Sequence, residues 1–383
     1  MMALAKGAGA IAGIGQTEFS KDSGRSELQL ASEAVRAALD DAGLAPADVD
    51  GLVTMTHDTN DEHALIRSVG IEHVRWTSRT PFGGGGSAAL VEHAAAAVAS
   101  GAADVVVVFR AFNERSGARF GQPTGRAVTP GLSWHLPYGL DTPAKMYALW
   151  YQRYMHQFGL TNEDFGRYTV VARKHAATNP NAWFYKRPIT IDDHQNSRWI
   201  VEPILRLLDC CQESDGGVAL VVTSAARAKD LRRPLVTIDG ATQGSVINSD
   251  ILFNYYDHDL ARFPQAEYVA RQLWQSTGLG PGDIDAAMIY ENFSPVVFYQ
   301  LEAFGFCGHG EAKDFIVDGH IELGGRLPVN THGGLLGEAY IHGVNNIIEG
   351  VRQIRGSAAN QVPDARHVLC AVGHSAVVLG SGD

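Results

Sequence analysis

The side chains best suited to covalent or metal chemistry are few and widely separated in this chain. Its four cysteines, Cys210, Cys211, Cys307 and Cys370, form no C-x-x-C pair, and its 15 histidines show no spacing typical of a metal site. A disulfide framework or a zinc centre is therefore not expected, and a reducing cytoplasm is the natural location. We expect no metal and no bound cofactor.

A run of four glycines, Gly83 to Gly86, is the next feature that could serve chemistry. Ser87 and an alanine-rich segment follow it, which predicts a tight turn leading into a helix. Such a turn could cradle a phosphate, but GGGG matches no known phosphate loop, so this is the weaker interpretation. Ser87 is better explained as a helix-start serine that accepts hydrogen bonds from free backbone amides.

Two tyrosines stand in polar surroundings, Tyr290 in IYENFS and Tyr340 in GEAYIHG. A phenol can take or give a proton, but its ordinary pKa is about 10, so a tyrosine base needs a depressed pKa or a hydrogen-bonded relay. Tyrosine is also a common core residue with a satisfied hydroxyl. Neither tyrosine by itself therefore predicts a catalytic site.

Charge and hydropathy exclude several classes of partner. The net charge is −11 and no long lysine or arginine run occurs, so the basic face that nucleic acid requires is not expected. No apolar run approaches the ~20 residues of a membrane-spanning helix. The first residues, MMALAKGAGAIAGIG, predict a strand and a turn rather than a signal peptide.

An internal repeat indicates how the elements are arranged. Residues 26–53 and 265–290 each contain an amphipathic helix pattern that ends at a glycine, Gly43 or Gly278. Each helix is followed by G-L-x-P-x-D-[VI]-D and then by an apolar stretch typical of a buried strand. The pattern predicts a duplicated unit.

A second pair of segments supports the duplication. Residues 83–110 and 330–356 each contain a glycine-rich helix start. A strand ends the first segment, and the strand HVLCAV follows the second. Strands that alternate with helices favour a layered α/β fold. We expect an N-terminal half at 1–235, with an inserted loop region at about 112–200 that could cover a site, and a C-terminal half at 236–383.

Long stretches of the chain resemble the thiolase superfamily, specifically its sterol-carrier-protein-X-like branch of lipid-transfer thiolases. The most specific are residues 289–316, IYENFSPVVFYQLEAFGFCGHGEAKDFI, and residues 327–356, LPVNTHGGLLGEAYIHGVNNIIEGVRQIRG. RAFNERSG at 110–117 and KHAATNPNA at 174–182 also resemble this branch. The resemblance implies the thiolase fold, with two similar α/β halves in five α-β-α-β-α layers, usually as a homodimer. It is stronger for fold than for reaction.

The resemblance also implies that the thiolase nucleophile is missing. Where relatives have C-S-T-G-S-T-A-L, this chain has GGGGSAAL, so Gly83 stands at the cysteine position. Near the C-terminus Gly373 matches the first glycine of C-I-G-G-G, which places Ala371 at the second cysteine position and Cys370 one residue away. Adjacent strand residues face opposite sides, so we expect Cys370 in the core, with a shifted alignment as the alternative. Cys307 and the pair Cys210–Cys211 are interpreted as packing residues.

At two further catalytic positions of the family, the resemblance places tyrosine. The histidine of G-H-P lies ten residues after the asparagine of N-x-x-G-G, and ten residues after Asn330 is Tyr340. The polar residue that begins N-E-A-F or H-D-C-F corresponds to Tyr290.

Other residues of these two motifs are candidates for supporting roles. His332 could donate a hydrogen bond to a thioester oxygen, as could backbone amides near Gly373. Asn292 could orient Tyr290, and so could Glu291. His342 is interpreted as structural.

Without a nucleophile an acyl-enzyme cannot form, so a retro-aldol lyase is favoured over a thiolase. Cleavage of a 3-hydroxyacyl-CoA needs a base, an acid and donors for the thioester oxygen, and two tyrosines can supply the first two. The most similar branch members are side-chain aldolases that release propionyl-CoA from a 17-hydroxy steroid acyl-CoA and leave a 17-ketosteroid. They work with a separate OB-fold protein that carries a zinc-ribbon-like segment, which implies a heterotetramer.

Two alternatives remain. The first is a degradative thiolase, an acetyl-CoA acyltransferase, that uses Cys370 or Cys307. The second is a non-catalytic protein that binds acyl-CoA or lipid. Trapping of an acyl-enzyme would favour the first, and failure to release a ketone from a 3-hydroxyacyl-CoA would favour the second.

Overall fold

The computed structural model describes residues 7, 9–122, 133–247, 249, 255 and 259–382. Its strands are β1 (Gly9–Gln16), β2 (Gly51–Met55), β3 (Trp76–Thr80), β4 (Val105–Asn113), β5 (Trp199–Val201), β6 (Leu205–Arg206), β7 (Asp215–Ser224), β8 (Thr237–Gln243), β9 (Ala286–Ile289), β10 (His367–Ala371) and β11 (Ser375–Gly380). Its helices are α1 (Glu27–Ala42), α2 (Glu62–Val69), α3 (Ser87–Ala99), α5 (Pro143–Phe158), α6 (Asn162–Thr178), α7 (Ile191–Gln195), α8 (Ala225–Ala228), α9 (Pro264–Thr277), α10 (Pro295–Ala303), α11 (Ala312–Val317), α12 (Gly334–Gly337) and α13 (Val344–Ile354).

The sheet order confirms the predicted duplication. The strands run β3-β2-β4-β7-β1-β8-β11-β10-β9, so β2-β4-β7-β1 in one half corresponds to β9-β10-β11-β8 in the other. The directions also agree, because β2–β4 and β9–β10 are parallel whereas the two following pairs in each half are antiparallel. The halves meet through a single registered pair, Ala10 opposite Thr237.

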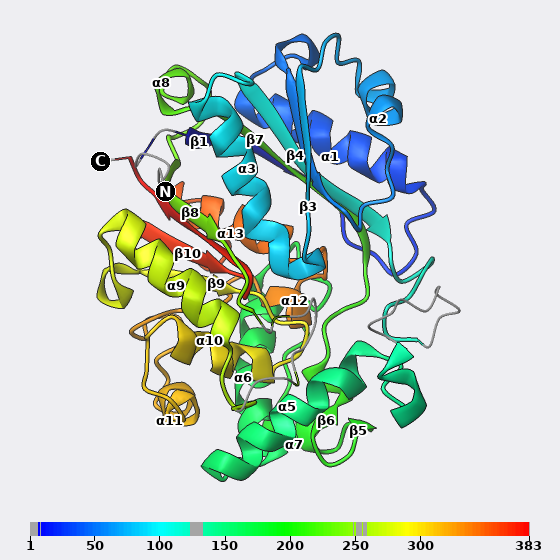
Figure 1. The fold of residues 1–383 in the computed structure, drawn as a ribbon, viewed down its shortest axis with the longest axis vertical. Helices are drawn as coiled ribbons and strands as arrows, with labels where there is room; N and C mark the ends of the chain where they lie inside the picture. The colour runs from blue at the N-terminus through cyan, green and yellow to red at the C-terminus, as the bar shows by residue number, and fades with distance from the viewer. Residues whose placement is uncertain are drawn as a thin grey trace.

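Helices separate and cover the two halves of the sheet, as Figure 1 shows. Helix α1 packs on β1, β4 and β7, and α9 packs on β8 and β11. Helices α3 and α13 contact each other and strands of both halves, so they form the middle layer. This is the five-layered α-β-α-β-α arrangement that the resemblance to thiolases implied.

Local sequence signals explain the repeated helices. Helix α1 begins at Ser26, whose side chain accepts from the Gln29 amide, and ends at Gly43 in the left-handed conformation, with φ 75°. Helix α9 ends in the same way at Gly278, with φ 70°. The alanines of α3 allow close packing in the middle layer, where a methyl group on Gly9 would lie 3.2 Å from the Ala95 Cβ.

The region expected as an inserted loop at about 112–200 contains three helices among its described residues. Helices α5, α6 and α7 occupy most of its second half, at the bottom of Figure 1. In α5 the buried residues Met146, Trp150 and Tyr154 recur every four positions and pack into the core beneath β9 and α10. The expectation of loop was wrong here because the aromatic content of this segment masked its helical period. Within the part of the chain that the structure describes, every helix is too short or too polar to cross a bilayer.

Candidate active site

A cavity of about 460 Å³ opens where loops from both halves of the fold converge. Its polar end is formed by Gly83–Gly85 before α3, Tyr290 after β9, Tyr340 between α12 and α13, and the β10–β11 turn at Val372 and His374. One wall is apolar and comes from α5, α10 and the loop between β9 and α10: Tyr147, Trp150, Tyr151, Phe293, Val296 and Tyr299. The cavity therefore joins a large apolar surface to a small polar end.

Tyr290 and Tyr340 meet at this polar end. Their hydroxyl oxygens are 2.7 Å apart and either can be the donor. The two residues are 8% and 7% exposed, and burial raises the pKa of both phenols well above the usual value. Both therefore carry a proton at neutral pH, and their hydrogen bond is a path along which a proton can move.

The end of β9 holds Tyr290. Its amide donates to the Ala371 carbonyl at 2.8 Å, and the Gln300 side chain donates to its carbonyl at 2.7 Å. The Asn330 side chain pairs with both the amide and the carbonyl of Ile289, at 2.8 Å each, as a neighbouring strand would. Asn330 thus fixes the residue immediately before the catalytic candidate.

The glycine turn leaves space for the Tyr290 ring. A methyl group on Gly84 would collide with the Tyr290 hydroxyl oxygen, and one on Gly343 would lie 2.8 Å from its Cδ2. Gly83 has a φ of 52° and carries no side chain that could act as a nucleophile. Gly84 of this turn therefore leaves the space that the Tyr290 hydroxyl occupies.

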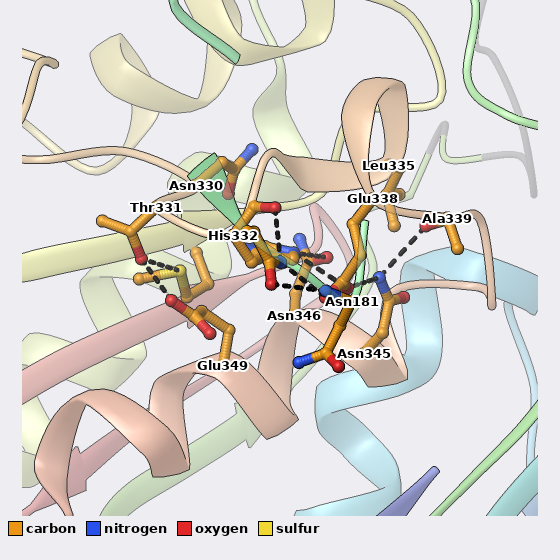
Figure 2. A network of polar contacts seen from close by, with 12 residues as sticks. Asn181, Asn330, Thr331, His332, Leu335, Glu338, Ala339, Asn345, Asn346 and Glu349 are labelled. Atoms are coloured by element: carbon orange, nitrogen blue, oxygen red, sulfur yellow. Dashed lines mark hydrogen bonds and ion pairs between the residues drawn. The ribbon is translucent and has the colours of Figure 1, made fainter. Parts of the chain in front are cut away.

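The loop between α12 and α13 holds Tyr340. Its amide donates to the Ser214 hydroxyl at 3.3 Å. Asn345 donates through its side chain to the Ala339 carbonyl and to a Glu338 carboxyl oxygen, both at 3.0 Å (Figure 2). Burial raises the pKa of Glu338 to about 7. The two residues before Tyr340 in the chain therefore belong to a buried polar network.

His332 belongs to that network and does not line the cavity. Figure 2 shows it beside Asn346, whose side-chain oxygen lies 3.2 Å from His332 Nε2. It is fully buried, and burial lowers its pKa to about 4, so the ring is neutral. The structure does not bring His332 to the tyrosine pair.

Asn292 and Gly373 differ in their relation to the cavity. Asn292 lines it from the loop between β9 and α10. Gly373 is not itself a lining residue but lies between Val372 and His374, which are. Its φ of 83° is in the left-handed region, which favours glycine.

No cysteine is placed as a thiolase would require. Cys370 is buried in β10 and Cys307 follows α10, and neither lines the cavity. Cys210 and Cys211, which were interpreted as packing residues, do line it. Burial raises the pKa of all four thiols, that of Cys307 to about 12, so each remains a thiol at neutral pH.

Several polar lining residues have no counterpart in the sequence analysis. Glu114 is 2% exposed, and burial together with Glu213 raises its carboxyl pKa well above the usual range. Burial lowers the pKa of Lys21 to about 8. The others include His57 and His374, and His342, interpreted above as structural, lines the cavity as well. These residues come from separate segments of the chain. Only Glu114 could have been noticed in the sequence, because it lies in RAFNERSG, a stretch that resembles the thiolase branch.

A family model and two relatives show what this chain is similar to. Residues 254–378 match the family described as Thiolase C-terminal domain-like. The steroid side-chain-cleaving aldolase of Thermomonospora curvata is 56% identical, and the alignment covers 99% of this chain and 100% of that protein. The 17-hydroxy-3-oxo-4-pregnene-20-carboxyl-CoA lyase of Mycobacterium tuberculosis is also 56% identical, with 98% and 100% covered.

Solved structures agree in fold. The structure described as Ltp2-ChsH2(DUF35) aldolase superposes with a TM-score of 0.94 at 56% identity, and 99% of each chain is covered. Human mitochondrial 3-ketoacyl-CoA thiolase superposes with a TM-score of 0.67 at 14% identity, again with 99% of each chain covered, and shows the shared fold alone.

Proposed function

The chain belongs to the thiolase superfamily, in the group of steroid side-chain-cleaving aldolases, and we propose that its hydrogen-bonded pair Tyr290–Tyr340 carries the proton transfers of the reaction. It is a carbon–carbon lyase that acts on a steroid side-chain CoA thioester, because relatives with that activity are 56% identical over nearly its whole length. The 2.7 Å contact between the two phenol oxygens is the observation that supports the role of the pair.

Retro-aldol cleavage moves one proton from oxygen to carbon. One tyrosine oxygen accepts the proton of the 17-hydroxyl as the bond between C17 and the side chain breaks. The bonding electrons pass to the thioester as an enolate, and a proton added to its α-carbon gives propionyl-CoA and the 17-ketosteroid. No other reactant is consumed.

A shared hydrogen bond suits this transfer because both phenols begin protonated. The first tyrosine can accept the hydroxyl proton while its own proton passes to the second, which protonates the carbon. Both residues are then neutral again, so a free phenolate is not required.

The other predicted residues fit supporting roles in this proposal. Asn292, which lines the cavity, would orient the substrate, and the backbone around Gly373 is a candidate donor to the thioester oxygen. His332, outside the cavity, would act by supporting the loop that carries Tyr340. The apolar wall of α5 and α10 offers a surface for the steroid rings.

The degradative thiolase is the less favoured alternative. It requires a thiolate that attacks the thioester, and the turn at Gly83 has no side chain. A mass-spectrometric search for acyl-enzyme after incubation with acetyl-CoA should find none.

We further propose partners and a location. The Ltp2-ChsH2(DUF35) aldolase is described together with a DUF35 protein. By analogy this chain would form a homodimer that binds a separate DUF35-type protein, with an OB fold and a zinc-ribbon-like segment, in a cytoplasmic heterotetramer. The order of strands supports a division into halves at 1–235 and 236–383.

Conservative substitution of each tyrosine tests the central claim. Tyr290→Phe and Tyr340→Phe should each lower kcat for the 17-hydroxy steroid CoA thioester by at least ~10²-fold, the loss typical of a missing general acid or base. Ketone and propionyl-CoA are measured directly, with thermal unfolding to confirm folding. Tyr185→Phe, at an exposed tyrosine, serves as the matched control. Near-normal turnover in both folded variants would contradict the mechanism.

A further inference from the structure

His342 is the histidine that the structure places beside the tyrosine pair. It lines the cavity, and its ring centroid lies 5.0 Å from that of Tyr340. It is 4% exposed and has a φ of 49°, an uncommon conformation for a residue other than glycine. Such backbone conformations concentrate at functional sites. From the sequence alone, His342 is interpreted as structural, and the candidate donors are His332 and the backbone amides near Gly373.

A buried ion pair anchors this ring from behind. Arg110 on β4 donates through Nε to His342 Nδ1 at 3.2 Å. The same guanidinium is paired with Asp58 at 2.9 Å, and both of these side chains are almost fully buried. Asp58 is fixed in turn by the backbone amides of Ala111, at 3.1 Å, and Asn60, at 2.9 Å.

This contact determines where the imidazole carries its proton. Arginine has only donors and stays charged in proteins, so Nδ1 of His342 must be the acceptor. A proton on Nδ1 would set two donors against each other. The ring is therefore the neutral tautomer with its proton on Nε2, and its position is held by neighbours with little freedom to move.

We propose that His342, through Nε2–H, is a catalytic hydrogen-bond donor to the thioester oxygen as it becomes the enolate oxygen, with Arg110 and Asp58 as its positioning residues. The inference rests on the proposed retro-aldol function and assigns the donor that this function requires. A donor fixed before the reaction stabilises developing negative charge without reorganisation. Because its tautomer is locked, the imidazole does not compete with the tyrosines for the transferred proton.

Two variants of similar size separate donation from packing. His342→Gln can accept from Arg110 through its amide oxygen and donate through its amide nitrogen, whereas His342→Leu can do neither. His342→Leu should lower kcat by ~10²–10³-fold, the loss expected for one oxyanion donor. His342→Gln should retain at least about tenfold more activity, and KM should change by less than about threefold in both. His63→Gln, on the exposed side of α2, is the surface control.

Exchange of the propionyl-CoA α-hydrogens in D₂O isolates the enolate step, since it involves no 17-hydroxyl. It should fall with His342→Leu by about the same factor as cleavage. Loss of cleavage with unchanged exchange would overturn the assignment to the thioester oxygen. So would a kcat within about threefold of wild type in folded His342→Leu, or equal losses in the Gln and Leu variants.

A spectroscopic test does not depend on turnover. Nitrogen NMR of wild-type protein with labelled histidine should show, for the signal missing from His342→Gln, a protonated Nε2 and an unprotonated Nδ1. The opposite tautomer or a doubly protonated ring would overturn the proposal. If the wild type does not cleave the steroid thioester, or if both tyrosine-to-phenylalanine variants do so normally, the proposed function fails instead.

Discussion

At the scale of residues, the site depends on the absence of a cysteine at Gly83 and on the tyrosine that lies beside the glycine turn. Thiolase-like chemistry needs a cysteine at Gly83, and without it the glycine turn approaches the phenol of Tyr290 closely. Tyr340 then completes a pair of neutral phenols whose pKa values are raised by burial. A site built in this way favours proton relay over nucleophilic attack.

The close approach of the turn can be tested by adding one methyl group. Gly84→Ala should lower kcat by at least ~10²-fold, because the new Cβ displaces the Tyr290 hydroxyl and small misplacements of catalytic groups are costly. Gly282→Ala, where an added Cβ meets nothing within 4 Å, is the control. In a Tyr290→Phe background Gly84→Ala should cause little further loss of kcat. A full additional loss there would show that Gly84 acts by another route.

At the scale of elements, the catalytic candidates lie at element ends and are held by the residues beside them. Tyr290 follows β9 and is fixed through Asn330, while Tyr340 stands in a short loop supported by Glu338 and Asn345. The network in Figure 2 is buried and polar, so its protonation contributes to stability.

Glu338 gives this network a predictable pH dependence. Its pKa of about 7 when folded, against 4.5 for a free carboxyl, means that the folded protein binds an extra proton between these values. Stability from this group is therefore present below about pH 4.5 and is lost as pH rises through 7. Glu338→Gln does not titrate, so the Tm of the variant minus that of wild type should increase from pH 5 to pH 8. Glu163→Gln, exposed on α6, is the control, and a constant difference for Glu338→Gln would contradict the assignment.

At the scale of the whole molecule, the cavity exists because two similar halves bring their strand ends and helix starts to one place. Residues from both halves line it, and α5 adds the aromatic wall. Its volume of about 460 Å³ is within the range of small-molecule sites.

The proposed assembly is tested on the intact protein. Light scattering should give the mass of two chains for the protein alone and of two chains plus two partners after addition of a DUF35-type protein. Activity should rise with partner concentration until the complex is saturated. A monomer that shows full activity without a partner would contradict the proposed assembly.

The sequence by itself determined the duplicated α/β architecture, because the helix, its terminal glycine and the following strand recur at 26–53 and 265–290. It also determined the absence of a nucleophile at Gly83 and the positions of Tyr290 and Tyr340, because these depend on residue order within motifs.

Only the tertiary structure decided which polar side chains share the cavity. His332 and His342 are ten residues apart in one motif-bearing segment, yet His332 is buried in a separate network and His342 lies beside Tyr340. Helix α5 and the residues Glu114 and Cys211 reach the cavity from other parts of the chain. These contacts depend on how the layers pack and on the backbone conformation of loops. Local sequence periodicity predicts neither of these.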